Sequence, residues 1–178
     1  MFFIRGLIVV LLCVPLVGFG VEKNKNGQAA EKSDIQKKIE ENVVVTNKLD
    51  VELGKAGGIK KKQIAAGAML GYYFKVTDGY SAYCNSIGRP VPNLTHVFSV
   101  RHARLYEEAA KYVDSEKIRA YSADRVMVEG RSSIDRAASY YKVTAAEFCA
   151  AIDTDAEKFV PLIHFSALMP QASAALLR

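Results

Sequence analysis

The chain has 178 residues, of which 50% are hydrophobic and 24% are charged. This balance is ordinary for a globular protein with a buried core, and the length provides material for one domain. The formal net charge of +5 is a modest excess that solubility alone explains, so composition argues against a dedicated nucleic-acid or membrane-surface patch.

Residues 1–20 have the layout of a cleavable signal peptide. One cation precedes an apolar run of about a dozen residues, and Gly18 and Gly20 are the small residues before a cut ahead of Val21. The alternative is an uncleaved membrane anchor, because the apolar stretch approaches the length of about 17–25 residues that a bilayer requires. We expect cleavage, and therefore a periplasmic or extracellular protein.

Export changes the expected state of the cysteines. Cys13 is removed with the signal peptide, which leaves Cys84 and Cys149. In an oxidising compartment, an even pair in a small domain most simply forms one disulfide. The sequence has no C-x-x-C pair, so the bond is predicted to be structural. Both cysteines lie in helical patterns, so the bond requires two helix ends to meet, as in an antiparallel pair within a bundle.

Residues 21–58 are predicted to form a flexible leader, beginning with a stretch of polar and small residues. Residues 35–53 fit either a short helix or a hairpin, because their apolar positions match both periods. A glycine-rich break at 54–58 precedes three consecutive lysines. We therefore place the start of the helical domain at residue 59.

Residues 59–178 are predicted to be an all-α domain, a compact bundle of about five helices. The first core helix carries apolar residues at a spacing of three or four from Met69 to Ile87. Gly67 and Gly71 lie on this helix, and we expect another backbone to approach it closely there. The second helix is expected at 94–113, opened by Pro92 with Asn93, and has an apolar stripe that includes Phe98 and Leu105.

A third helix is expected to begin after Asp114 and to end at Gly130, followed by a short fourth helix capped by Ser132. A fifth begins at Thr144, which forms a capping box with Glu147. The remaining residues, 159–177, are bulky and carry no formal charge apart from a histidine, but two prolines argue against a membrane span. We expect this segment to be buried against the bundle.

Candidate site residues are few. The sequence has no metal-binding or nucleotide-binding motif, so no metal and no cofactor is predicted. His102 lies on the apolar stripe of the second helix, where an imidazole can act as a general base or as an acid sensor, or can simply be a core histidine bonded to a carbonyl or a tyrosine hydroxyl. Tyrosines are frequent in recognition surfaces, and our candidates for binding are Tyr72, Tyr80, Tyr140 and Tyr141.

These patterns favour an exported, non-catalytic interaction or accessory protein of the cell envelope. Its expected partner is another envelope protein or a cell-wall component, with no nucleic acid, and with membrane contact only if the N-terminal segment is retained. One alternative is a small envelope hydrolase with a cleft near His102. Another is a membrane-tethered envelope or secretion component with an uncleaved anchor.

Overall fold

The computed structural model describes residues 48–178, and this part of the chain is helical without a strand. The predicted all-α fold class is therefore confirmed, whereas the predicted signal peptide and the leader up to residue 47 lie outside the described residues. The elements are a helix over residues 48–55, α2 (Gly58–Phe74), the π-helical turn η1 (Lys75–Tyr80), α3 (Ser81–Ser86), α4 (Pro92–Ala110), α5 (Ser115–Tyr141), α6 (Ala145–Thr154), α7 (Ala156–Phe159), the 3-10 turn η2 (Val160–Ile163), α8 (Phe165–Leu168) and α9 (Pro170–Leu177).

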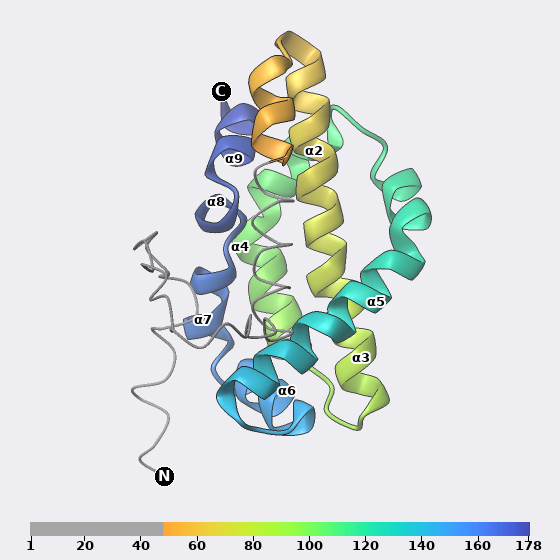
Figure 1. Ribbon diagram of the computed structural model, residues 1–178, viewed down its shortest axis with the longest axis vertical. Coiled ribbons are helices and arrows are strands. Elements are labelled where there is room, and N and C mark those ends of the chain that lie inside the picture. Colours follow the sequence, from red (N-terminus) through yellow and green to blue (C-terminus); the bar gives the residue numbers. More distant parts are fainter. Residues whose placement is uncertain (1–47) are drawn as a thin grey trace, which may run out of the picture. The chain divides into compact units, whose positions relative to one another are not determined.

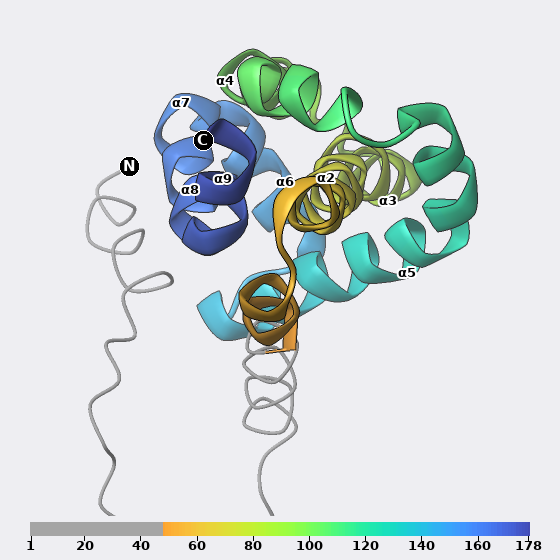
Figure 2. The ribbon, with the colours of Figure 1, turned by 90° about the horizontal axis from the view of Figure 1, so that it is seen from above.

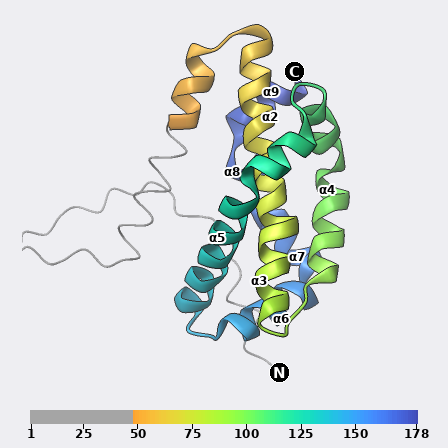
Figure 3. The same cartoon turned by 90° about the vertical axis from the view of Figure 1, so that its right-hand side faces the viewer.

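The segments α2, η1 and α3 follow one another as a single rod through the bundle (Figures 1 and 3). Helix α4 returns antiparallel beside α2, and α5 crosses the rod at η1. After α6, the short elements α7 to α9 run back along α4 and α2, as the view from above shows (Figure 2). The rod therefore contacts α4, α5, α6 and α9.

Two apolar clusters form the core. The first joins the first half of the rod to the end of α4, the middle of α5 and the C-terminal segment, and it includes Met69, Leu70 and Phe165. The second surrounds the disulfide and includes Phe98 and Ile152. The predicted stripe on α4 is confirmed, because every buried residue of α4 belongs to it.

Local signals set the starts of α4, α5 and α6 where the sequence predicted them. Pro92 occupies the first turn of α4, where its missing N–H removes no helical hydrogen bond. The Asp114 carboxylate accepts a hydrogen bond from the backbone N–H of Lys117 at the start of α5. The capping box is confirmed: Thr144 and Glu147 exchange side-chain to backbone hydrogen bonds at the start of α6.

The prediction that a helix ends at Gly130 and another begins after Ser132 was wrong. Helix α5 continues through both positions, and Gly130 is buried within it. The reason is a close crossing between α5 and η1: a Cβ atom at Gly130 would lie 2.5 Å from the carbonyl carbon of Gly79, and one at Gly79 would lie 2.3 Å from the carbonyl oxygen of Val126. Gly130 is needed because a side chain at this position would collide with the backbone of η1. It does not mark the end of a helix.

The predicted close approach at Gly67 and Gly71 is also corrected. No atom of the described residues lies within 4 Å of a Cβ placed at either glycine, apart from the immediate surroundings of the helix itself. The two glycines at the crossing are Gly79 and Gly130, which are 51 positions apart and come from different elements. The spacing of Gly67 and Gly71 within one helix therefore indicated the wrong pair of glycines.

Helical packing begins before the predicted domain start at residue 59. Residues 48–55 are helical, so the hairpin alternative does not hold for the described part of 35–53. Leu53 is only 1% exposed and belongs to the first core cluster, with Leu49 packed against it. The glycine-rich break is a turn between this helix and α2, in which Gly58 adopts a φ of 51°.

The C-terminal segment docks on the bundle as predicted. Phe165, Ala172 and Leu176 are buried, and they pack in the same cluster as α2. Among the described residues, no single helix is long and apolar enough to cross a membrane; one bent pair, Ala156–Leu168 with Pro170–Leu177, meets the length and composition test.

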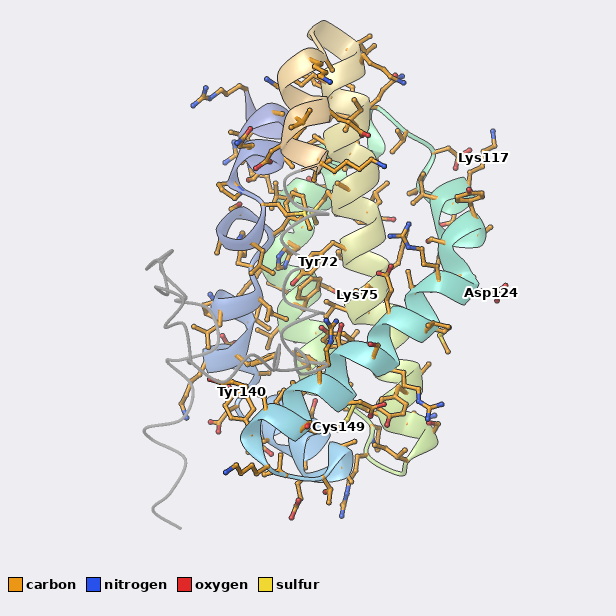
Figure 4. The ribbon with its side chains drawn as sticks, viewed as in Figure 1. Tyr72, Lys75, Lys117, Asp124, Tyr140 and Cys149 are labelled. Atoms are coloured by element: carbon orange, nitrogen blue, oxygen red, sulfur yellow. A yellow bond between two sulfur atoms is a disulfide. The ribbon has the colours of Figure 1, made fainter. Side chains whose placement is uncertain are left out.

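Cys84 and Cys149 form the predicted disulfide, with a Cα–Cα distance of 5.8 Å. The bond joins the C-terminal end of the rod to the first turns of α6, and both cysteines are fully buried. Figure 4 shows Cys149 at the end of the bundle where α3, α5 and α6 meet.

Candidate functional site

Two neighbouring hollows open where η1 and α3 face α4 and the first half of α5. The larger has a volume of about 820 Å³ and the smaller about 330 Å³. Asp78 and Arg119 line both hollows, so we treat them as one groove. The other residues of the larger hollow are Thr77, Ser81, Ala82, Asn85, Pro90, Val91, Pro92, Thr95, His96 and Ser99, and those of the smaller are Glu116, Ala120, Ala123, Val126 and Met127.

An ion pair lies at the middle of the groove. Arg119 Nε donates to Asp78 Oδ2 over 2.8 Å, and Arg119 Nη2 donates to Asp78 Oδ1 over 3.3 Å. The guanidinium also lies over the ring of Phe74, 5.6 Å from its centroid. A two-bond pair has a defined geometry that a single contact lacks, so it holds the first half of α5 at a set distance from η1.

Four hydroxyl side chains contribute to the polar lining of the larger hollow, and each is hydrogen-bonded within the protein. Ser81 and Thr95 share a hydrogen bond of 2.8 Å between α3 and α4. The Tyr73 hydroxyl donates to Ser99 over 3.0 Å. The side chains of Asn85 and His96 are exposed at the rim. The groove therefore offers a fixed polar surface with a few exposed amide and imidazole groups.

The first half of α5 projects from the bundle beside the groove. Figure 4 shows Lys117 and Asp124 of this half pointing away from the other helices. Tyr121 is 93% exposed and Val128 is 69% exposed, so apolar surface lies on the solvent side of α5 next to the groove. Only a narrow side of the first half of α5 packs inward, through Ile118, Ser122 and Val126.

His102 is sealed within the core and does not face the groove. Its Nε2 accepts a hydrogen bond of 3.0 Å from the backbone N–H of Phe165, so the proton is on Nδ1, which donates to the Phe98 carbonyl over 2.9 Å. The ring is fully buried and stacks between Phe98 and His164, at centroid distances of 3.9 and 4.3 Å. Both nitrogens have partners, so His102 holds the C-terminal segment against α4 and has no free site for a proton.

Burial lowers the pKa of His102 to about 4, and repulsion from His164 acts in the same direction, while the bond to the Phe98 carbonyl opposes it. The unfolded chain takes up this proton near pH 6.5 and the folded protein does not. We therefore expect the free energy of unfolding to fall as the pH drops from about 6.5 to about 4, by about 3 kcal/mol from this residue alone. Urea titrations monitored by circular dichroism at several pH values will measure the slope.

The matched variants are His102→Gln and His96→Gln. Glutamine at 102 keeps an acceptor for Phe165 but does not titrate, so the slope between pH 6.5 and 4 should flatten. His96 is exposed on α4, so the His96→Gln protein should keep the slope of the parent. A parent slope that survives His102→Gln would show that another group is responsible.

Of the tyrosines predicted to bind a partner, only Tyr140 is well exposed, at 48%. The hydroxyl of Tyr72 donates to the Ile163 carbonyl over 2.5 Å, and burial raises the pKa of Tyr72 well above its ordinary value. Burial also raises the pKa of Tyr80. Tyr141 stacks on Phe148 at a centroid distance of 6.0 Å. Figure 4 shows Tyr72 inside the bundle and Tyr140 at its outer end.

The structure does not bring the predicted site residues together. His102 and Tyr72 both fasten the C-terminal segment, Tyr80 and Tyr141 pack on the second core cluster, and Cys84 bonds to Cys149. Sequence reasoning missed Asp78 and Arg119 because they are 41 positions apart and each resembles an ordinary surface charge. The one local signal was Asp78-Gly79, which interrupts the apolar pattern of the first core helix.

Within residues 48–178, no group of three or more His, Cys, Asp or Glu side chains is placed to hold a metal ion. A scan against protein-family models, a search of the curated proteins and a search of the solved structures found no match to this chain.

Proposed function

We propose that this protein is an exported, non-catalytic interaction or accessory protein of the cell envelope, and that it binds a segment of another envelope protein in the groove between η1, α3, α4 and α5. The observation that supports this proposal is the Asp78–Arg119 pair, which lines both hollows and makes them one continuous surface. Polar side chains line the groove on one side of the Asp78–Arg119 pair, and alanines of α5 line it on the other side. These two surfaces suit an extended peptide that carries both polar and apolar side chains.

The chemistry of the histidines favours binding over catalysis. The hydrolase alternative needs His102 as an accessible base, but this ring is fully buried and both nitrogens are bonded within the protein. The histidine that lines the groove, His96, is exposed on the first turns of α4. A contact function requires no proton transfer and agrees with these positions.

The disulfide gives weak support to export. Bonds of this kind persist in oxidising compartments and are rare in the cytosol. Cys84 and Cys149 are fully buried, and the chain surrounding them is packed, which suits a permanent bond. Together with the N-terminal sequence pattern, this supports a periplasmic or extracellular location.

Blocking one hollow is expected to weaken binding at the other. A photo-crosslinking amino acid at Asn85, on the rim of the larger hollow, should give a discrete adduct with one partner in intact cells. Changing Ala123 to arginine fills the smaller hollow, so the yield of that adduct should fall about tenfold or more. Gel electrophoresis with mass spectrometry will identify and quantify the adduct.

The control is Ala150→Arg, which adds the same side chain at an exposed position of α6 outside both hollows. It should leave the adduct unchanged. Absence of an adduct from position 85, or an adduct whose yield is the same in Ala123→Arg, would rule out the groove as the binding surface.

A further inference from the structure

The positive charge of the described chain is concentrated at one end. Residues 63–178 carry thirteen lysines and arginines against twelve aspartates and glutamates, whereas residues 48–62 carry five lysines against two. These fifteen residues form the helix 48–55, the turn after it and the start of α2. Figures 1 and 3 show that this turn is the outermost point of one end of the bundle. We call residues 51–61 the lysine tip.

The lysines of the tip have no partner within the described part of the chain. Each ion pair found between described residues joins positions 78 and beyond. Among the described residues, Lys62, just after the tip, does have a partner: its Nζ donates to the Tyr112 hydroxyl over 3.1 Å. Lys55 and Lys60 are exposed and Lys61 is half-buried.

The position of these lysines is unfavourable for the helix itself. The first turn of α2 contains no acidic residue, and cations near a helix N-terminus oppose the helix dipole. A local cost for which the described residues supply no compensating contact is typical of a functional surface.

Apolar side chains lie among the charges. Ile59 is 68% exposed on the first turn of α2, directly before Lys60 and Lys61. Val51 is 52% exposed and lies one helical turn before Lys55, on the same side of its helix. Gly58, with its φ of 51°, shapes the turn that presents Ile59. A nucleic acid would use the lysines but would have no use for the aliphatic side chains.

We propose that the lysine tip docks on an anionic lipid bilayer, with Ile59 entering the headgroup region and Lys55, Lys60 and Lys61 facing lipid phosphates. Both parts of the chemistry match: exposed aliphatic groups gain from leaving water, and lysines near an anionic surface each add to the attraction. The tip shares no residue with the groove, so a bilayer and a partner protein can be held at once. This inference goes beyond the proposed function and does not depend on it. It departs from the expectation from overall composition, which argued against a membrane-surface patch because it does not register that lysines gather at one end.

The chain has no tryptophan, so a single tryptophan reports its own surroundings. In the Ile59→Trp protein, purified in its exported form, we expect a blue shift of the emission with vesicles of phosphatidylcholine and phosphatidylglycerol, and none with phosphatidylcholine alone. Tyr121→Trp, on the projecting half of α5, should show no shift with either. Added salt should reduce the response at position 59.

Charge reversal tests the lysines. Adding Lys60→Glu and Lys61→Glu to the Ile59→Trp protein should weaken the vesicle-dependent shift at least tenfold in lipid concentration. The matched control, Lys117→Glu with Lys142→Glu, makes the same change of net charge at exposed positions elsewhere and should have little effect. The proposal is overturned if the emission of the Ile59→Trp protein does not shift, if it shifts equally with neutral vesicles, or if the Lys60→Glu, Lys61→Glu change leaves the shift intact. Equal tryptophan responses to a DNA duplex and to anionic vesicles would also overturn it.

Discussion

Replacing Gly130 by alanine is expected to lower the free energy of unfolding by about 3 kcal/mol or more. The added methyl group would lie 2.5 Å from the carbonyl carbon of Gly79 and 2.8 Å from its Cα atom. These are backbone atoms in the middle of a helix, so they cannot move aside as the end of a flexible side chain can. Urea unfolding monitored by circular dichroism will measure the loss, and Gly79→Ala should give a loss of similar size because its methyl group meets the backbone of Val126.

Gly67→Ala is the matched control on the same rod. No described atom lies near the new methyl group, so the better helix propensity of alanine should dominate and raise the free energy of unfolding by about 0.5–1 kcal/mol. If α5 and η1 cross at Gly130, Gly67→Ala should raise the free energy of unfolding and Gly130→Ala should lower it. If Gly130→Ala is as stable as the parent, the two helices do not cross at this glycine pair.

Removing the disulfide is expected to have the other large effect. Cys84 and Cys149 are 65 positions apart, and closing a loop of this length stabilises a fold by about 4 kcal/mol in the chain-entropy model. We therefore expect Cys84→Ala with Cys149→Ala to lower the free energy of unfolding by about this amount. The bond joins the end of the rod to α6, so the helices around it should lose amide-exchange protection before the end that carries α9.

Reduction of the parent supplies the control for this pair of substitutions. Dithiothreitol should destabilise the parent by nearly the same amount and should leave the double alanine variant unchanged, both purified in their exported form so that the expected loss of the signal peptide also removes Cys13. Free thiols in the untreated exported protein, or a parent whose stability is indifferent to reductant, would contradict the prediction.

Several signals that act over a few residues were interpreted correctly from the sequence. Thr144 and Glu147 are three positions apart and bond to each other whatever the rest of the chain does, so the start of α6 could be predicted. The same is true of Pro92 at the start of α4 and of Asp114 at the start of α5. The stripe on α4 was also predicted, because a buried face needs the helical period.

Features that depend on two distant segments were not predictable in this way. A glycine can end a helix or can admit another backbone, and only the position of the other backbone decides between these roles. Gly130 and Gly79 come from different elements, so sequence alone favoured the commoner interpretation of Gly130 as a helix end. For the same reason, the groove was missed: Asp78 and Arg119 become a pair only after α5 crosses η1.

The π-helical turn between α2 and α3 also bears on which length changes the fold can accept. Such a turn hydrogen-bonds over five residues instead of four, and so takes up an additional residue without altering the orientation of the helix on either side. Elsewhere in the rod, loss of one residue would rotate the following part by about 100° relative to the part before it. Within residues 58–86, η1 is therefore the place where a natural one-residue deletion could be absorbed while Met69 and Cys84 both keep their orientation.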